Sequence, residues 1–297
     1  MDISIGHHTA VALLSRTVAK GSLVADLGAF PGGLTRVIKK EGWNVIAIDK
    51  DPDRGLTLQH RFKEGASRTD DADEPSFTQS MQDIGVETRV ADLEASPLPF
   101  ANKELDAALL TEVIEHLCVN PLFTLAEINR SLKPGGVLLI STPNLTALRR
   151  RIHFLDGNME AVIEPPYIAF LKKIKIGHVG HVRLYDPNEL KMMLTLLGFE
   201  SEFHYYNFEF WDPGPKASKA SEDPSAPIRP LKRPVWRKLL RSPADYFRAA
   251  KATLIDVLER RYPHFRVHRY VVARKVKEAD FERLSLADFA GVVDKRP

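Results

Sequence analysis

The chain has 297 residues, of which 44% are hydrophobic and 27% are charged, and its formal net charge at pH 7 is +3. These values are typical of a globular protein with one sizeable core and room for appendages. The charge is too small to argue for nucleic acid as a partner, and the single cysteine, Cys118, excludes an intrachain disulfide and a cysteine-based metal cluster. The sequence has neither a basic leader nor a stretch long enough to span a bilayer. We therefore expect a cytoplasmic protein, with peripheral membrane contact as the alternative.

The first fifty residues predict a helix, a strand, a glycine-bearing turn and a second helix. Apolar residues recur at helical spacing over His8–Ala19, and the apolar run Leu23–Ala25 predicts a strand over Leu23–Leu27. The helix after the turn is expected to end at Gly42. Gly28 suits a tight turn at the carboxyl end of the strand, and Gly32 would let a ligand approach the helix N-terminus.

A second buried strand is predicted over Asn44–Asp49, and it ends in an acidic residue. Asp49 lies about twenty residues after the glycine turn, where a carboxylate can accept hydrogen bonds from both hydroxyl groups of a ribose. A helix cap or turn role is the alternative, because Asp51-Pro52 follows directly. We favour ribose binding because of the glycine turn upstream.

The middle of the chain continues the alternation of strands and helices after an interruption. Glu64–Ser80 is rich in small, acidic and turn-forming residues, which predicts a loop or disordered insertion without secondary structure. Further strands are expected at Val86–Leu93, Leu105–Thr111 and Val137–Ser141, and Asn120-Pro121 begins a helix. This order indicates a parallel sheet covered on both faces. Ligands of such sheets bind at the carboxyl ends of the strands.

Several stretches resemble the class I S-adenosylmethionine (SAM)-dependent methyltransferases. Asp26-Leu27-Gly28-Ala29-Phe30-Pro31-Gly32 resembles their motif I, D-x-G-x-G-x-G, with Phe30 at the place of the middle glycine. Thr111–Leu117, Leu132–Asn144 and His181–Tyr185 are similar to later motifs of small-molecule and glycan-type members, and they follow in the expected order. The chain is thereby identified as a member of this family, close to type 11/12, ubiquinone O-methyltransferase-like and glycan-cluster enzymes.

The resemblance covers about residues 20–210 and a strand at Tyr270–Arg274. It implies an α/β, Rossmann-like fold with a seven-stranded, mostly parallel sheet of order 3-2-1-4-5-7-6, helices on both faces and a helical insert before the last strand. It also implies a domain plan: a methyltransferase core at 1–210 with a loop insertion at 64–82, a linker and basic amphipathic insert at 211–262, a closing core strand at 263–276 and a tail at 277–297.

The same resemblance implies that SAM lies across the strand ends. Its methionine carboxylate and amine would lie at the glycine turn, its ribose on Asp49 and its adenine beside Asp92 and Leu93. The methionine chain would run over Thr111. The expected cofactor-binding residues are Asp26, Gly28, Ala29, Phe30, Gly32, Asp49, Lys50, Asp92, Leu93 and Thr111.

Methyl transfer needs in-line positioning and, when the accepting atom holds a proton, a base. His116 is our leading candidate, because it follows the fourth strand and an imidazole titrates near neutrality. Glu112, Glu115 and His116 stand at i, i+3 and i+4, so they would share one helix face, and His181 from a later loop completes the expected catalytic set.

Two other interpretations of these residues stay open. Glu112, Glu115 and His116, joined by His178 or His181, would suit Mg²⁺ or another octahedral divalent ion, a pattern that resembles the metal site of the small-RNA 3′-terminal 2′-O-methyltransferases. The second is structural, with a glutamate capping a helix and the histidine bonded to backbone. We favour a site without metal.

Basic segments flank the expected site. Arg149–Arg151 and the lysines Lys172, Lys173 and Lys175 would form a solvated face or, beside an active site, hold a phosphate or carboxylate of the substrate. Asp212–Pro234 reads as a linker, and the basic, amphipathic stretch at 229–261 would contact an anionic membrane or grip a lipid-linked or phosphorylated substrate. A helical cover over the sheet edge or a homodimer contact is the alternative.

We therefore expect a SAM-dependent methyltransferase that acts on an oxygen of a sugar, a glycolipid or another small metabolite. One alternative is a metal-dependent RNA 2′-O-methyltransferase, which the modest net charge does not favour. The other is a catalytically inactive SAM-fold binding subunit, for which Phe30 is the one hint.

Overall fold

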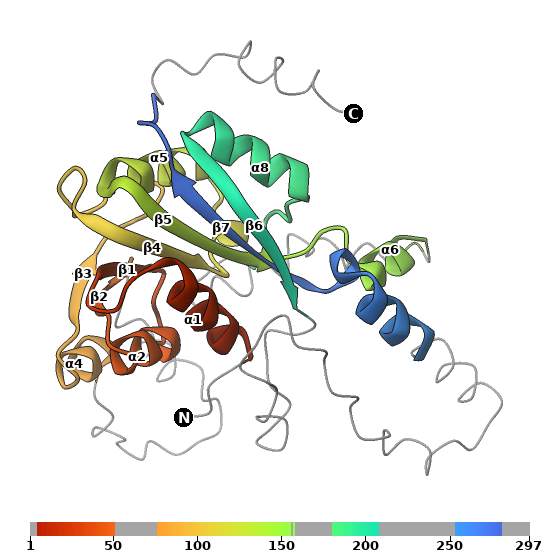
Figure 1. Cartoon of the computed structure of the whole chain (residues 1–297), viewed down its shortest axis with the longest axis horizontal. Coiled ribbons are helices and arrows are strands. Elements are labelled where there is room, and N and C mark those ends of the chain that lie inside the picture. Colours follow the sequence, from red (N-terminus) through yellow and green to blue (C-terminus); the bar gives the residue numbers. More distant parts are fainter. Residues whose placement is uncertain (1–4, 51–75, 156, 158–179, 208–252, 281–297) are drawn as a thin grey trace, which may run out of the picture.

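The computed structural model describes residues 5–50, 76–155, 157, 180–207 and 253–280. Its centre is a seven-stranded sheet of order β3-β2-β1-β4-β5-β7-β6 (Figure 1), which confirms the predicted fold and strand order. The strands are β1 (Leu23–Leu27), β2 (Asn44–Asp49), β3 (Glu87–Val90), β4 (Leu105–Thr111), β5 (Leu132–Pro143), β6 (Phe199–Asn207) and β7 (His268–Lys275).

The sheet is parallel except at its last strand. β1 pairs in parallel with β2 and β4, and β3 and β5 extend the sheet in the same sense. β7 is antiparallel to both β5 and β6. The carboxyl ends of β1 to β5 therefore meet at one edge, and β7 begins at that same edge.

Helices cover both faces of the sheet because successive strand residues point to opposite sides. Val24 and Leu109 belong to the core cluster that includes side chains of α1, α2 and α4, whereas their neighbours Ala25 and Leu110 belong to the cluster under α5 and α8. Figure 1 shows the two helical layers. The helices are α1 (Ile5–Thr17), α2 (Gly33–Lys40), α4 (Phe77–Gln82), α5 (Pro121–Ser131), α6 (Leu148–Leu155) and α8 (Pro187–Leu196), with 3-10 turns η1 (Ile114–His116) and η4 (Pro263–Phe265).

The end of the expected loop insertion is a helix, so the prediction of no secondary structure up to Ser80 was wrong there. The side chain of Ser76 caps α4 by accepting a hydrogen bond from the Gln79 backbone N–H at 3.1 Å. Phe77 and Met81 lie one helical turn apart and are buried, so packing stabilises a helix too short to form alone. Residues 51–75 lie outside the described part.

A helical arm continues from the site edge of the sheet (Figure 1). Residues 253–261 form a helix, and its fully buried Glu259 pairs with Arg149 of α6 through contacts of 3.1 and 3.2 Å. This helix belongs to the predicted basic insert at 211–262, of which residues 211–252 lie outside the described part of the chain. None of the described helices is long and apolar enough to cross a bilayer.

Candidate active site

The glycine turn joins β1 to α2 and lies against the segment that follows β4. Gly28 has φ +73°, and its N–H donates to the Ile48 carbonyl of β2 at 2.8 Å. A Cβ added to Gly28 would lie 2.6 Å from Val113 Cγ2. Position 28 therefore requires glycine for two reasons, its positive φ and the close approach of Val113.

The space in which a side chain of residue 32 would lie is filled by protein side chains, and the expected ligand approach to the Gly32 backbone stays a prediction. A Cβ on Gly32 would lie 2.7 Å from Met81 Cε and 3.0 Å from Phe77 Cε2, both of α4. Phe30, the residue that departs from the motif, packs its ring on Phe77 with the centroids 5.8 Å apart. Phe30 and Gly32 therefore form the surface of the turn on which α4 packs. Ala29, which precedes Phe30, is buried in the core cluster that also contains Phe77 and Met81.

Two buried carboxylates end β1 and β2. Asp26 is 2% exposed and accepts a hydrogen bond from Thr35 Oγ1 at 2.5 Å. Burial, opposed by the Thr35 hydrogen bond and reinforced by the charge of Asp49, raises the pKa of Asp26 to about 6. Asp49 is 3% exposed, and its Oδ2 accepts from the Phe30 backbone N–H at 3.2 Å. The site thus concentrates negative charge beside the glycine turn, where a cation would relieve it.

The remaining predicted cofactor residues lie along the same edge. Lys50 donates a hydrogen bond to Asp92 after the end of β3, and this bond is the main cause that lowers the pKa of Asp92. Leu93 is 8% exposed and belongs to the core under α5 and α8. Thr111 is the last residue of β4 and lies in register with Ser141 of β5. Their proposed contacts with SAM stay predictions.

Glu112 does not share a helix face with Glu115 and His116, so that expectation was wrong. Glu112 has φ +54°, which turns the chain before a helix can begin, and the turn that forms is the short η1. Its Oε1 accepts from Ser141 Oγ at 2.8 Å, and its Oε2 lies 3.3 Å from His268 Nδ1 at the start of β7. A non-glycine residue in this region is uncommon and often accompanies a functional site.

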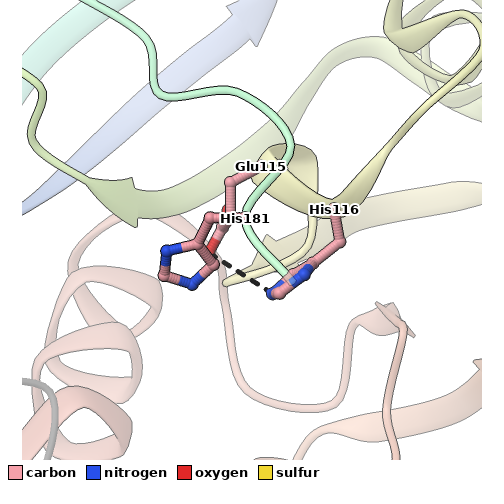
Figure 2. Close-up of side chains that lie close together, drawn as sticks. All are labelled: Glu115, His116 and His181. Atoms are coloured by element: carbon pink, nitrogen blue, oxygen red, sulfur yellow. Dashed lines mark ion pairs between the residues drawn. The ribbon is translucent and has the colours of Figure 1, made fainter. Parts of the chain in front are cut away.

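Glu115, His116 and His181 gather into one cluster at this edge (Figure 2). One ligand atom of each residue lies within 4.8 Å of the other two. The rings of the two histidines meet edge to face, with centroids 5.0 Å apart. His116 Nδ1 lies 3.2 Å from the Gly180 carbonyl oxygen, which can only accept, so Nδ1 is the donor there and Nε2 faces Glu115.

Glu115 is fully buried in this cluster. Its Oε2 accepts from Thr142 Oγ1 at 3.0 Å, and its Oε1 lies 3.9 Å from His116 Nε2. Burial and the charge of Glu112 raise the pKa of Glu115 well above its usual range. Its backbone carbonyl also accepts from the Val182 N–H at 2.8 Å, and this bond holds the His181 loop over η1.

Two residues join the site that the sequence did not single out. His268 comes from β7, far along the chain from its partner Glu112, and no local pattern marks it. Arg150 was noticed only within a basic run; burial lowers its pKa, and the charges of Glu112 and Glu115 oppose that shift. The arginine therefore lies within electrostatic reach of both carboxylates.

Asn144 ties the end of β5 to the segment before β7. Its side-chain N–H groups donate to the carbonyls of His264 and Arg266 at 2.9 and 2.8 Å. Its Oδ1 accepts from Arg269 at 2.6 Å, and its backbone carbonyl accepts from Arg150 at 2.9 Å. The buried Asn144 thus positions Arg150 through its backbone carbonyl and the start of β7 through its side-chain amide.

Comparison with known proteins identifies relatives of this arrangement. A family model described as a methyltransferase domain matches residues 8–202. A protein of Mycolicibacterium smegmatis named for S-adenosylmethionine-dependent methyltransferase activity is 35% identical over 117 residues, which is 39% of this chain and 36% of that protein. The ubiquinone biosynthesis O-methyltransferase of Azorhizobium caulinodans is 24% identical over 181 residues, 61% of this chain and 60% of that enzyme. The chain thus spans less than two thirds of either relative.

A solved structure repeats the fold. One chain of the complex between the Haloferax volcanii Trm112 methyltransferase activator and a methyltransferase aligns with a TM-score of 0.51 and 16% identity, covering 92% of this chain and 91% of that one. At this identity the likeness concerns the fold alone.

Proposed function

Because the chain belongs to the class I SAM-dependent methyltransferases, we propose that it transfers the methyl group of SAM to a hydroxyl oxygen of a small molecule such as a sugar, a glycolipid or a related metabolite. The observation that carries the acceptor side of this proposal is the orientation of His116. Its Nδ1 faces the Gly180 carbonyl at 3.2 Å, and its Nε2 faces the cluster with Glu115.

The residues at the strand ends fit the cofactor that the family implies. When bound, SAM supplies a methyl group already activated by its positive sulfur. Burial and, to a smaller extent, the charge of Asp49 raise the pKa of Asp26 to about 6, so a cationic amine at this edge is electrostatically favoured. Asp49, beside the Phe30 N–H, is proposed to accept from the ribose hydroxyls, and Gly28 and Ala29 to form the turn beneath the methionine end.

The acceptor hydroxyl would lie against the cluster of Glu115, His116 and His181. Its oxygen forms the new bond to the methyl carbon as the sulfur–methyl bond breaks, and the bonding pair stays on sulfur. The hydroxyl proton leaves on the side of the cluster, whose function is to lower the free energy of that deprotonation. Val113, wedged against Gly28, connects this half of the site to the cofactor half.

The test combines substrate discovery with a matched pair of variants. Cell extracts incubated with the purified protein and isotope-labelled SAM are analysed by mass spectrometry for newly methylated compounds. His116→Gln is expected to lower turnover by about 10²–10⁴-fold with unchanged SAM affinity in calorimetry. His153→Gln, in exposed α6, serves as the control and should keep full activity. Absence of SAM binding to the unmodified protein would overturn the proposal.

We also propose that the acceptor is lipid-linked and that the helical arm contacts an anionic membrane. Nonpolar side chains are exposed on the two helices of this arm. Phe154 and Leu155 of α6 are 52% and 88% exposed, and Leu254 and Val257 of the helix at 253–261 are 59% and 53% exposed. Such exposure on neighbouring helices with arginines nearby is typical of interfacial binding. The part of the predicted membrane stretch at 229–252 lies outside the described residues.

Liposome flotation tests the membrane contact. Leu155→Glu combined with Leu254→Glu should abolish association with vesicles of phosphatidylglycerol and phosphatidylcholine, whereas neutral vesicles should bind neither form. Unchanged flotation of this variant contradicts the proposal. A concentration-dependent dimer in sedimentation, lost in the same variant, would instead assign the surface to a homodimer contact.

A further inference from the structure

The three arginines of the run at 149–151 have different partners. Arg149 pairs with the buried carboxylate of Glu259 through contacts of 3.1 and 3.2 Å. Arg151 is exposed and donates from Nε to a backbone carbonyl at 2.8 Å. Arg150 faces the site. We propose that Arg150 binds an anionic group of the methyl acceptor, either a carboxylate or a phosphate. This inference rests on the proposed function, because it names the class of the acceptor.

Hydrogen bonds hold the guanidinium of Arg150 at the acceptor side of the site. Its Nη1 donates to the carbonyls of Asn144 at 2.9 Å and Val267 at 3.4 Å. These two residues lie directly after β5 and directly before β7, the strands whose side chains contact Glu112 and Glu115. The charges of both glutamates act on Arg150. The guanidinium therefore lies at the edge of the sheet where the acceptor hydroxyl is proposed to bind.

One edge of this guanidinium is available to a ligand. Nε–H and one N–H of Nη2 lie side by side on an arginine, and together they match two oxygens of a carboxylate or a phosphate. Both hydrogen bonds of Arg150 to described residues use Nη1 instead. Its Nε is buried and has no hydrogen-bond partner among those residues. A buried donor without an acceptor is costly, and an oxygen of a bound anion would satisfy it.

The charges near Asn144 favour an anion. Arg269 is fully buried and donates to Asn144 Oδ1 at 2.6 Å, so two guanidinium groups meet at this residue. Burial and the charge of Glu112 raise the pKa of Glu115 well above its usual range, which favours the neutral form of that carboxyl group. Among these two arginines and two glutamates, positive charge therefore exceeds negative charge. An acidic acceptor would balance the difference.

An anion on Arg150 would orient the acceptor without taking part in methyl transfer. The anionic group and the reacting hydroxyl would be held at two points of the site, which favours one orientation of the molecule. Because such a contact is the same before and during methyl transfer, its loss weakens acceptor binding and leaves the chemical step unchanged. Arg150 is therefore expected to act on KM rather than on kcat.

The charge of the acceptor is measured first. Cell extract in a neutral detergent is passed over an anion-exchange resin at about pH 8, where carboxylates and phosphates are ionised. Each fraction is incubated with the purified full chain and methyl-labelled SAM. We expect the methylated compound in the retained fraction. Treatment of that fraction with alkaline phosphatase should remove the acceptor if the anion is a phosphate, and carbodiimide coupling to methylamine should remove it if the anion is a carboxylate.

Variants then test the residue, with the retained fraction as acceptor. Arg150→Gln should raise the apparent KM for the acceptor by about 10–100-fold, with kcat and the Kd for SAM nearly unchanged. Arg150→Lys keeps the charge without the paired N–H groups, so its KM should lie between those of the other two forms. Lys191→Gln removes one positive charge from an exposed position of α8 and should leave KM unchanged.

The outcomes separate this inference from the proposed function. An acceptor in the unretained fraction, an acceptor that survives both treatments, or an unchanged KM in Arg150→Gln overturns the anion site while the methyltransferase stands. A lower kcat or weaker SAM binding in Arg150→Gln, without a change in KM, also overturns it, because Arg150 then has a structural role. If no fraction is methylated and calorimetry detects no SAM binding, the proposed function fails and this inference fails with it.

Discussion

Replacement of Gly28 by alanine should destabilise the protein through two separable costs. The residue has φ +73°, and a side chain with a Cβ in the left-handed region costs about 1–2 kcal/mol. The new Cβ would also lie 2.6 Å from Val113 Cγ2, and overpacking of this kind costs about 1–3 kcal/mol. We expect Gly28→Ala to lower the free energy of unfolding by about 2–5 kcal/mol, measured by urea denaturation at constant m-value.

Two further variants separate the costs. Gly42 has φ +96°, and a Cβ there would meet no atom within 4 Å, so Gly42→Ala should show the backbone cost alone, about 1–2 kcal/mol. Combining Gly28→Ala with Val113→Ala should recover about 1–3 kcal/mol as a coupling energy. If Gly28→Ala lowers the free energy of unfolding no more than Gly42→Ala does, or if Val113→Ala recovers none of the loss, then Gly28 and Val113 are not in the close contact described.

Three further predictions address other parts of the structure. Because the pKa of Asp26 is raised from 3.8 to about 6, the folded state binds its proton more tightly than the unfolded state, so stability falls by about 3 kcal/mol in all as the pH rises from about 3 to about 7, through the folded-state pKa. Asp26→Asn should flatten this profile in urea titrations, and an unchanged slope would contradict it. Met81→Ala removes a fully buried side chain that fills the space beside Gly32 and should lower the free energy of unfolding by about 2–5 kcal/mol. An unchanged midpoint in a thermal scan would argue against the packing of α4 on the glycine turn. Arg149→Ala leaves the buried carboxylate of Glu259 without this partner and should lower the free energy of unfolding by about 1–3 kcal/mol. The added change Glu259→Gln should restore most of that loss. If it does not, the Arg149–Glu259 pair is not what holds the two helices together.

Much of the fold could be predicted from local pattern. Leu23–Leu27, Asn44–Asp49 and Leu105–Thr111 were predicted as strands with the bounds that the structure has, because buried parallel strands are continuous apolar runs between polar turns. α4 was missed because its window contains one aromatic residue and many polar ones. Its stability comes from Phe77 and Met81 packing on the turn at Gly32, and such tertiary contacts are not visible in composition.

The candidate site could be predicted in position but not in detail. The acids and the glycine turn were expected at one edge of the sheet, and Asp26 and Asp49 lie there, because the carboxyl ends of parallel strands converge. The helix expected over Glu112 does not form, since a positive φ at a non-glycine residue has no sequence signature. His268 reaches Glu112 only through the antiparallel pairing of β7 with β5, which no spacing rule could reveal.

The place of β7 in the sheet has a consequence for synthesis of the chain. β7 is the last of the described strands to leave the ribosome, yet it separates β5 from β6. About 125 residues lie between Pro143 and His268, and at about 5–20 residues per second they take about 6–25 s to translate. During that interval the edge of β5, with the apolar run Leu138–Ile140, has no β7 to pair with and is open to strands of other nascent chains. Translation speed between β5 and β7, rather than the stability of the finished sheet, should therefore determine how much protein aggregates on expression.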